Sequence, residues 1–125
     1  MKITSFNPLI VTGNAQAAIE LFEAMGFERR HTATVNPSGN DIVSVRLKDA
    51  NGFYVDVAQV DGRTQDITLI RMNVDDFEEA CAFLTEKGFK NSRTDGSTVD
   101  TRTNRSAMMI FPSGFAFDLC QHIKN

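Results

Sequence analysis

Gly52-Phe-Tyr-Val-Asp-Val-Ala-Gln59 decides the fold of this chain, because it returns 62 positions later as Gly114-Phe-Ala-Phe-Asp-Leu-Cys-Gln121. The same offset places Ala18–Phe27, which ends in Gly-Phe, onto Ala80–Phe89, which also ends in Gly-Phe. Two landmarks that share one offset without a gap indicate a single structural unit that is encoded twice.

The first copy predicts one helix among four strands. Apolar residues at helical spacing between Ala15 and Met25 predict the helix, with Asn14 as its N-cap and Gly26 as its terminating glycine. Turns are expected at 36–40 and at 49–52, where Pro, Gly and Asn-Gly gather. The expected strands are 6–11, 28–35, 41–48 and 53–60. The unit is therefore β-α-β-β-β.

The second copy repeats this order. It predicts a strand over 67–74, a helix that begins after Asp76 and ends at Gly88, and strands over 107–111 and 115–122. The segment 89–106 is polar and contains three arginines, which are Arg93, Arg102 and Arg105. It is expected to be a solvated loop or hairpin. The alternative is a loop at the mouth of a cavity, where arginine can pair with an anion or stack on a planar ligand.

The two copies are expected to form one α+β domain over 1–125. The units are 1–60 and 67–125, and the segment 61–66 joins them. Each unit alone is too small to bury its sheet well, so we expect the two to fold together.

Composition excludes several classes of protein. A net charge of −3 argues against nucleic acid as a partner, and no apolar run approaches the ~20 residues that cross a bilayer. Cys81 and Cys120 lie in apolar runs without metal-ligand spacing, which is typical of free thiols in a reducing cytoplasm. We therefore expect a cytoplasmic protein that binds neither nucleic acid nor membranes.

Two tandem β-α-β-β-β units, each with Gly-Phe after its helix and Gly-Phe-x-x-Asp at its last strand, resemble the vicinal oxygen chelate superfamily. This superfamily includes glyoxalases, ring-cleaving dioxygenases and bleomycin resistance proteins, and the resemblance covers essentially the whole chain. It implies curved mixed sheets around a cavity, with the helices on the convex side, and a homodimer. The fold hosts many chemistries, so the resemblance is specific for the fold and weak for the activity.

The resemblance also implies where a divalent metal would bind. The family's ligand positions fall on Asn7, Asp56, Leu69 and Asp118, where metal-binding members have His, Gln or Glu. Leu69 has no donor atom, and Asn7 is a weak neutral ligand. We therefore expect no metal site and no cofactor, and at most a weakly held divalent cation with water completing its shell.

Strand periodicity divides the side chains between two faces. One face is uniformly apolar in both copies, for example at Val55, Val57, Met72 and Leu119, which favours packing against the helices. Seven phenylalanines lie at positions that face a helix or belong to the apolar stripe of a helix, and we expect them in the core. They are Phe22, Phe27, Phe53, Phe83, Phe89, Phe115 and Phe117. On the opposite, mixed face the expected ligand contacts are Asn7, Leu9, Tyr54, Asp56, Arg71, Asn73 and Asp118.

The charged members of the mixed face allow two interpretations. Arg71 can form a structural ion pair with Asp56, with Asp118 or with both, because a buried charge needs a partner. The same groups can instead contact a ligand, and the two roles are compatible. Tyr54 has the same ambiguity between a packing role and a ligand contact.

Three functions remain open. The first is a metal-free protein, similar to the bleomycin resistance type, that sequesters a small organic ligand without bond chemistry. The second is a lyase, isomerase or dioxygenase whose divalent ion is held by Asp56, Asp118, Asn7 and water and acts as a Lewis acid. The third is a divergent scaffold whose own side chains fill the cavity. The incomplete ligand set favours the first and leaves enzymatic activity undecided.

Overall fold

The computed structural model describes residues 1–35, 42–101 and 103–123. The fold is α+β, as predicted. A β-α-β-β-β series opens on β1 (Ile3–Thr12), and a second series, which has one further short strand, opens on β5 (Ile67–Val74). The turn predicted at 36–40 and Arg102 lie outside the described residues. Contacts divide the chain into two compact units, Asn7–Thr68 and Leu69–Asn125 with Met1–Phe6, which we call the first and the second unit.

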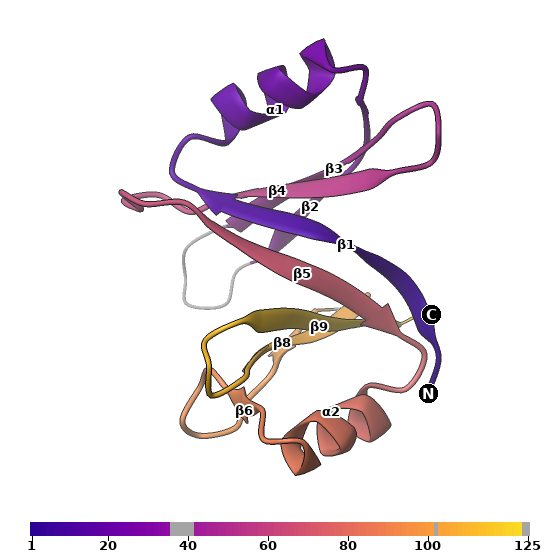
Figure 1. Ribbon diagram of the computed structural model, residues 1–125, viewed down its shortest axis with the longest axis vertical. Helices are drawn as coiled ribbons and strands as arrows, with labels where there is room; N and C mark the ends of the chain where they lie inside the picture. The colour runs from indigo at the N-terminus through magenta and orange to yellow at the C-terminus, as the bar shows by residue number, and fades with distance from the viewer. Residues whose placement is uncertain (36–41, 102, 124–125) are drawn as a thin grey trace. The chain divides into compact units, whose positions relative to one another are not determined.

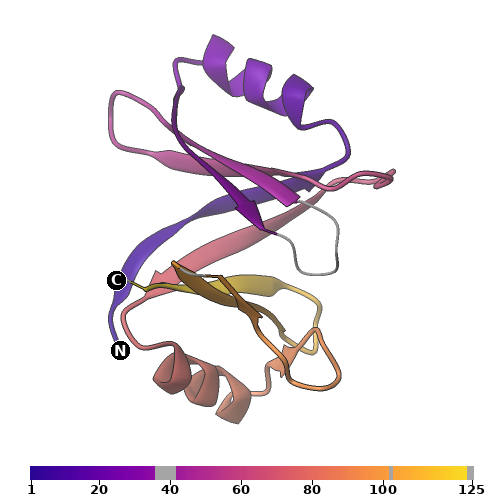
Figure 2. The ribbon, with the colours of Figure 1, turned by 180° about the vertical axis from the view of Figure 1, so that it is seen from behind.

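The first unit has the strand order β2-β3-β4-β1. Its helix, α1 (Ala15–Ala24), lies over one face of this sheet (Figures 1 and 2). The Asn14 side chain accepts a hydrogen bond from the Ala17 N–H at 3.3 Å, and Gly26 has a φ of +106°, so both predicted helix ends are confirmed. The remaining strands are β2 (Glu28–Val35), β3 (Ile42–Lys48) and β4 (Tyr54–Gln59).

The second unit has the order β5-β9-β8-β6, and a further short strand, β7, also pairs with β8. Its helix is α2 (Phe77–Glu86), which Asp76 caps by accepting from the Glu79 N–H at 3.1 Å. Between α2 and β8 the described residues of the polar segment form only two-residue strands, because their hydrogen bonds go largely to their own side chains and turns. The strands are β6 (Lys90–Asn91), β7 (Val99–Asp100), β8 (Asn104–Ile110) and β9 (Ala116–His122).

The start of β1 belongs to the second unit. The Lys2 N–H donates to Asp75 Oδ1 at 2.6 Å, and the Asp75 N–H donates back to the Lys2 carbonyl at 3.0 Å. Asn73 Nδ2 donates to Ser5 Oγ at 2.5 Å. The opening strand therefore contributes to both units along its length.

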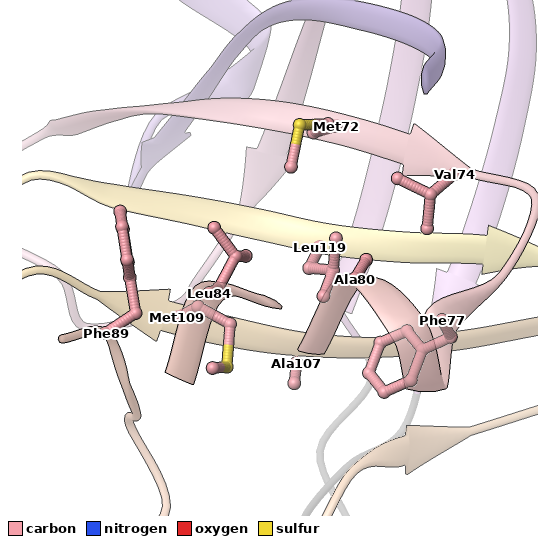
Figure 3. Close-up of a cluster of buried hydrophobic side chains, with 9 residues drawn as sticks. All are labelled: Met72, Val74, Phe77, Ala80, Leu84, Phe89, Ala107, Met109 and Leu119. Atoms are coloured by element: carbon pink, nitrogen blue, oxygen red, sulfur yellow. The ribbon is translucent and has the colours of Figure 1, made fainter. Parts of the chain in front are cut away.

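Each helix packs on the apolar face that strand periodicity predicts. In the first unit Ile19 of α1 packs with Val55 and Val57 of β4. In the second unit Leu84 and Ala80 of α2 lie against Leu119 of β9 (Figure 3). The assignment of the apolar faces is confirmed in both units.

Three of the predicted core phenylalanines are exposed instead. Phe53, Phe83 and Phe115 are 66%, 48% and 51% exposed. Phe53 and Phe115 stand just before the first residues of β4 and β9, and the Phe115 ring meets Phe89 with 5.5 Å between ring centres. Phe83 lies on the outer side of α2, where the Lys87 ammonium is 5.6 Å from its ring centre. Across the described residues, no helix is long and apolar enough to cross a membrane.

The core predicts a clear contrast between two leucines. Leu119→Ala should lower the free energy of unfolding by about 2–5 kcal/mol, because Leu119 is fully buried and truncation leaves a cavity. Leu21→Ala, on the exposed side of α1, should cost less than about 1 kcal/mol. Urea unfolding measures both values, and equal losses would contradict the packing described above.

Candidate functional site

The first unit has a buried ion pair on the sheet face opposite α1. Asp56 of β4 is 0% exposed, and Arg46 of β3 is its direct cross-strand neighbour. Arg46 Nε donates to Asp56 Oδ1 at 2.9 Å, and Nη2 donates to Oδ2 at 3.0 Å. Two parallel charge-assisted bonds of this kind are the strongest arrangement open to a guanidinium and a carboxylate.

The β3–β4 hairpin sets this register. Gly52 in the turn has a φ of +89°, and Asp49 Oδ1 accepts from the N–H groups of Asn51 and Phe53. The pairing then runs from Lys48 opposite Tyr54 inward to Arg46 opposite Asp56. The local turn chemistry therefore places the arginine beside the carboxylate.

Two predicted contacts adjoin the pair on β1. Asn7 is buried, its Oδ1 accepts from Arg46 Nη2 at 3.2 Å, and its Nδ2 donates to the Pro8 carbonyl at 3.0 Å. Leu9 is also buried and is the parallel neighbour of Asp56. The structure thus brings together Asn7, Leu9 and Asp56, which are three of the expected ligand contacts.

Tyr54 lies beside the ion pair rather than within the core. Its ring is half-buried, with the Arg46 guanidinium carbon 5.2 Å and the Lys48 ammonium 5.3 Å from the ring centre. Both distances lie in the range of cation–π attraction. The phenol therefore forms part of a basic, partly exposed surface next to Asp56.

The second unit has its own arginine–aspartate pair. Arg71 of β5 is the parallel neighbour of Asp118 of β9, and its Nε donates to Asp118 Oδ2 at 2.9 Å. The prediction that Arg71 pairs with an aspartate is confirmed for Asp118. Leu69 and Asn73 are half-buried on the same strand, and Asn73 is bound to Ser5.

The two pairs are built on opposite sides of equivalent carboxylates. Asp56 has Leu9 on its parallel neighbour and Arg46 on its antiparallel neighbour. Asp118 has Arg71 on its parallel neighbour and Met108 on its antiparallel neighbour. The 62-residue offset carries Leu9 onto Arg71 and Arg46 onto Met108, so the copies have exchanged the arginine between flanking strands.

Sequence analysis missed Arg46. Arg46 is absent from the ligand contacts that are expected on the mixed face. The signal was present, because the Asn51-Gly52 turn fixes the hairpin and counting back from Lys48 opposite Tyr54 reaches Arg46 opposite Asp56. Only the cross-strand register, not the strand pattern, identifies the pair.

The two described arginines of 89–106, Arg93 and Arg105, have partners outside this face. Arg105 Nη1 donates to Glu78 of α2 at 2.5 Å, and its guanidinium carbon is 5.3 Å from the ring centre of Phe77. Arg93 Nη1 donates to Ser97 within its own loop at 3.3 Å. Both arginines therefore serve local structure.

The side chains present do not fit a divalent metal. In the first unit the carboxylate of Asp56 and the amide oxygen of Asn7 accept from one guanidinium, whose positive charge repels a cation. In the second unit Asp118 is engaged by Arg71, and Leu69 offers no donor. Across 1–35, 42–101 and 103–123, no three His, Cys, Asp or Glu side chains gather to hold a metal ion.

Solved structures share this architecture. The chain matches a glyoxalase/bleomycin resistance protein/dioxygenase superfamily member from Vibrio splendidus 12B01, with 16% identity, 98% and 100% of the two chains covered and a TM-score of 0.62. It matches a methylmalonyl-CoA epimerase with 20% identity, 94% of each chain and a TM-score of 0.63. The chain has the vicinal oxygen chelate fold.

The match to a larger enzyme is partial. Glyoxalase I from Zea mays aligns with 98% of this chain at 16% identity and a TM-score of 0.67, but this chain spans only 44% of that enzyme. No protein-family model matches the sequence, and no curated protein matches it. Identities at this level establish the fold and leave the chemistry to the site residues.

Removing one partner of the Arg46–Asp56 ion pair should cost more stability than removing both partners. Arg46→Leu should lower the free energy of unfolding by about 3–5 kcal/mol, because it leaves the Asp56 carboxylate buried without this partner. Arg46→Leu combined with Asp56→Leu should recover much of that loss. Urea unfolding of the single and double variants gives the coupling energy.

Arg30→Leu is the matched control, because Arg30 forms an ion pair that is exposed to solvent. Its Nη2 lies 3.5 Å from Oε2 of Glu28, and both side chains are exposed. It should change the free energy of unfolding by less than about 1 kcal/mol. If Arg46→Leu costs no more than this control, the ion pair does not hold the sheet register.

Proposed function

We propose that this protein binds a small organic ligand on the sheet face opposite its helices, without a metal and without bond chemistry. The observation that carries the proposal is the guanidinium at each aspartate in the family's metal-ligand position, with Nε–Oδ distances of 2.9 Å in both units. A guanidinium there supplies the positive charge that a metal would supply, but it has no coordination site for a substrate oxygen.

The chemistry of this face favours an anionic or planar ligand. The side chains of Arg46 and Arg71 are 25% and 21% exposed, so part of each arginine side chain is accessible to solvent. Arginine pairs with carboxylates and stacks on flat rings, and Tyr54 adds an aromatic surface beside Arg46. An aromatic carboxylate offers both kinds of contact.

Several of the similar structures are enzymes by name, while the Vibrio splendidus protein carries a superfamily description that includes bleomycin resistance. The arginine–aspartate pairs favour the binding function for this chain. We extend the proposal to a cytoplasmic homodimer, for which light scattering should give twice the chain mass of 13.9 kDa.

Metal titration distinguishes this proposal from a metal-dependent enzyme. An ion that binds only the folded state would raise the Tm. Because we expect no metal site, Mn²⁺, Ni²⁺, Zn²⁺ or Mg²⁺ at millimolar concentration should leave the Tm unchanged in thermal unfolding. Asp118→Asn provides the comparison. A rise in Tm with any of these ions that Asp118→Asn abolishes would support the metal-dependent enzyme instead.

Ligand binding has a direct reporter, because Tyr54 is the only tyrosine and the chain has no tryptophan. With 3-fluorotyrosine incorporated, 2-naphthoate should shift the single ¹⁹F resonance in a saturable way. Tyr54→Leu should weaken binding about tenfold by calorimetry, since aromatic and cation–π contacts contribute about 1–2 kcal/mol.

Arg71→Gln tests the second unit separately, and Arg30→Gln is the charge-matched control that should bind as the wild type does. If Arg71→Gln weakens binding and Tyr54→Leu does not, the ligand uses the second unit. If 2-naphthoate leaves the ¹⁹F resonance unmoved and calorimetry detects no binding, the preference for aromatic carboxylates is wrong.

A further inference from the structure

A cavity lies in the first unit, and its lining contains neither Arg46 nor Asp56. It has a volume of about 580 Å³, within the range of small-molecule sites. Its walls come from the end of β1, the first turns of α1 and the segment after β4. The lining residues include Ile10, which packs with the helix-side core, so the cavity opens on the helix side of the sheet. Figures 1 and 2 show the segment after β4 leaving the sheet near the point where β1 turns toward α1.

The cavity is held by tight backbone packing. A Cβ at Gly13 would lie 2.4 Å from the Arg63 carbonyl oxygen, so only glycine permits this approach. The Val60 N–H donates to the Thr12 carbonyl at 2.9 Å, and the Arg63 N–H donates to the Val60 carbonyl at 3.3 Å. The backbone of Arg63 is therefore fixed against the end of β1.

One wall of the cavity is apolar and open to solvent. Ala17, Ala18, Leu21 and Phe22 of α1 line it, and Leu21 is 59% exposed. An exposed leucine beside a half-buried phenylalanine leaves apolar surface that a ligand can remove from water, at about 25 cal/mol per Å².

The segment after β4 contributes one positive and one negative side chain to the lining of the cavity. Arg63 and Asp66 both line the cavity, and within the described part of the chain neither forms an ion pair or a side-chain hydrogen bond. Two of the nearby helix N–H groups are already used, since Ala15 donates to Gln59 Oε1 at 2.8 Å and Ala17 donates to Asn14 Oδ1. An anion in the cavity therefore depends on Arg63, and a cation depends on Asp66.

The corresponding positions of the second unit differ in size and charge. The 62-residue offset replaces Ala15 with Phe77, which is almost fully buried, and Ala17 with Glu79. The first turn of α2 contains two acidic residues, whereas that of α1 contains none. Small neutral residues at the start of α1 keep the space open and spare an anion from repulsion.

From these features we infer that the cavity binds a small zwitterion with an apolar body, the chemistry of an apolar α-amino acid. Arg63 pairs with the ligand carboxylate, Asp66 pairs with its ammonium group, and Leu21 and Phe22 cover the apolar side chain. A ligand with both charges pairs with both Arg63 and Asp66, whereas a simple anion would leave Asp66 opposing it.

The test uses three probes of one shape on the full chain. L-phenylalanine should bind, while 3-phenylpropionate and 2-phenylethylamine, which each lack one charge, should bind at least tenfold more weakly. Amide NMR shifts should be largest at Gly13, Ala17 and Leu21. Shifts centred on Tyr54 and Asp56 would instead assign the probe to the sheet face and overturn this inference.

Variants separate charge from shape. Arg63→Gln and Asp66→Asn should each weaken L-phenylalanine binding about tenfold, and Ala17→Leu should block it by filling the cavity from an exposed helix position. Arg30→Gln removes an exposed arginine elsewhere in the unit and should have no effect. Unchanged affinity in Arg63→Gln, equal affinity for 3-phenylpropionate, or no binding of any probe would overturn the inference.

Discussion

The buried carboxylate of Asp56 is the constraint on which the first unit depends. A fully buried charge needs a partner in contact, and Arg46 supplies it through two parallel bonds that exist in only one register of β3 and β4. A slip of one residue would turn Arg46 toward α1 and Val45 or Leu47 away from it, because side chains alternate between faces. The helix-side core and the ion pair therefore specify the same register, and Asn7 adds β1 to it.

The exchange of arginines between the copies shows what was preserved after duplication. Each unit keeps an aspartate at the same place and a guanidinium against it. The guanidinium comes from β3 in the first unit and from β5 in the second, with Leu9 and Met108 at the vacated positions. Either arrangement neutralises the carboxylate at similar distance, so the local charge balance is conserved rather than the residue. A metal ligand would not tolerate this exchange, because coordination fixes the donor's position as well as its charge.

The sequence predicts the fold well because its signals are local. Caps such as Asn14 and Asp76 act within one turn, and the period of the strands separates the apolar face without knowledge of the partners. The exposed Phe53 and Phe115 show the limit, since period gives the direction of a side chain but not how much of it the neighbouring elements cover. The Arg46–Asp56 pair and the helix-side cavity depend on register and on loop placement, which the pattern of one strand does not contain.

The differences between the copies therefore bear on function more than their likeness does. On the mixed face the units differ in which strand presents the arginine, so the accessible guanidinium edge differs between Asp56 and Asp118 although the carboxylates are equivalent. On the helix side, Phe77 fills a place that Ala15 leaves small. A duplicated fold that kept both copies identical would offer the same surface twice. Divergence at these few contact positions, with caps, turns and core retained, allows one scaffold to present chemically distinct surfaces without loss of stability.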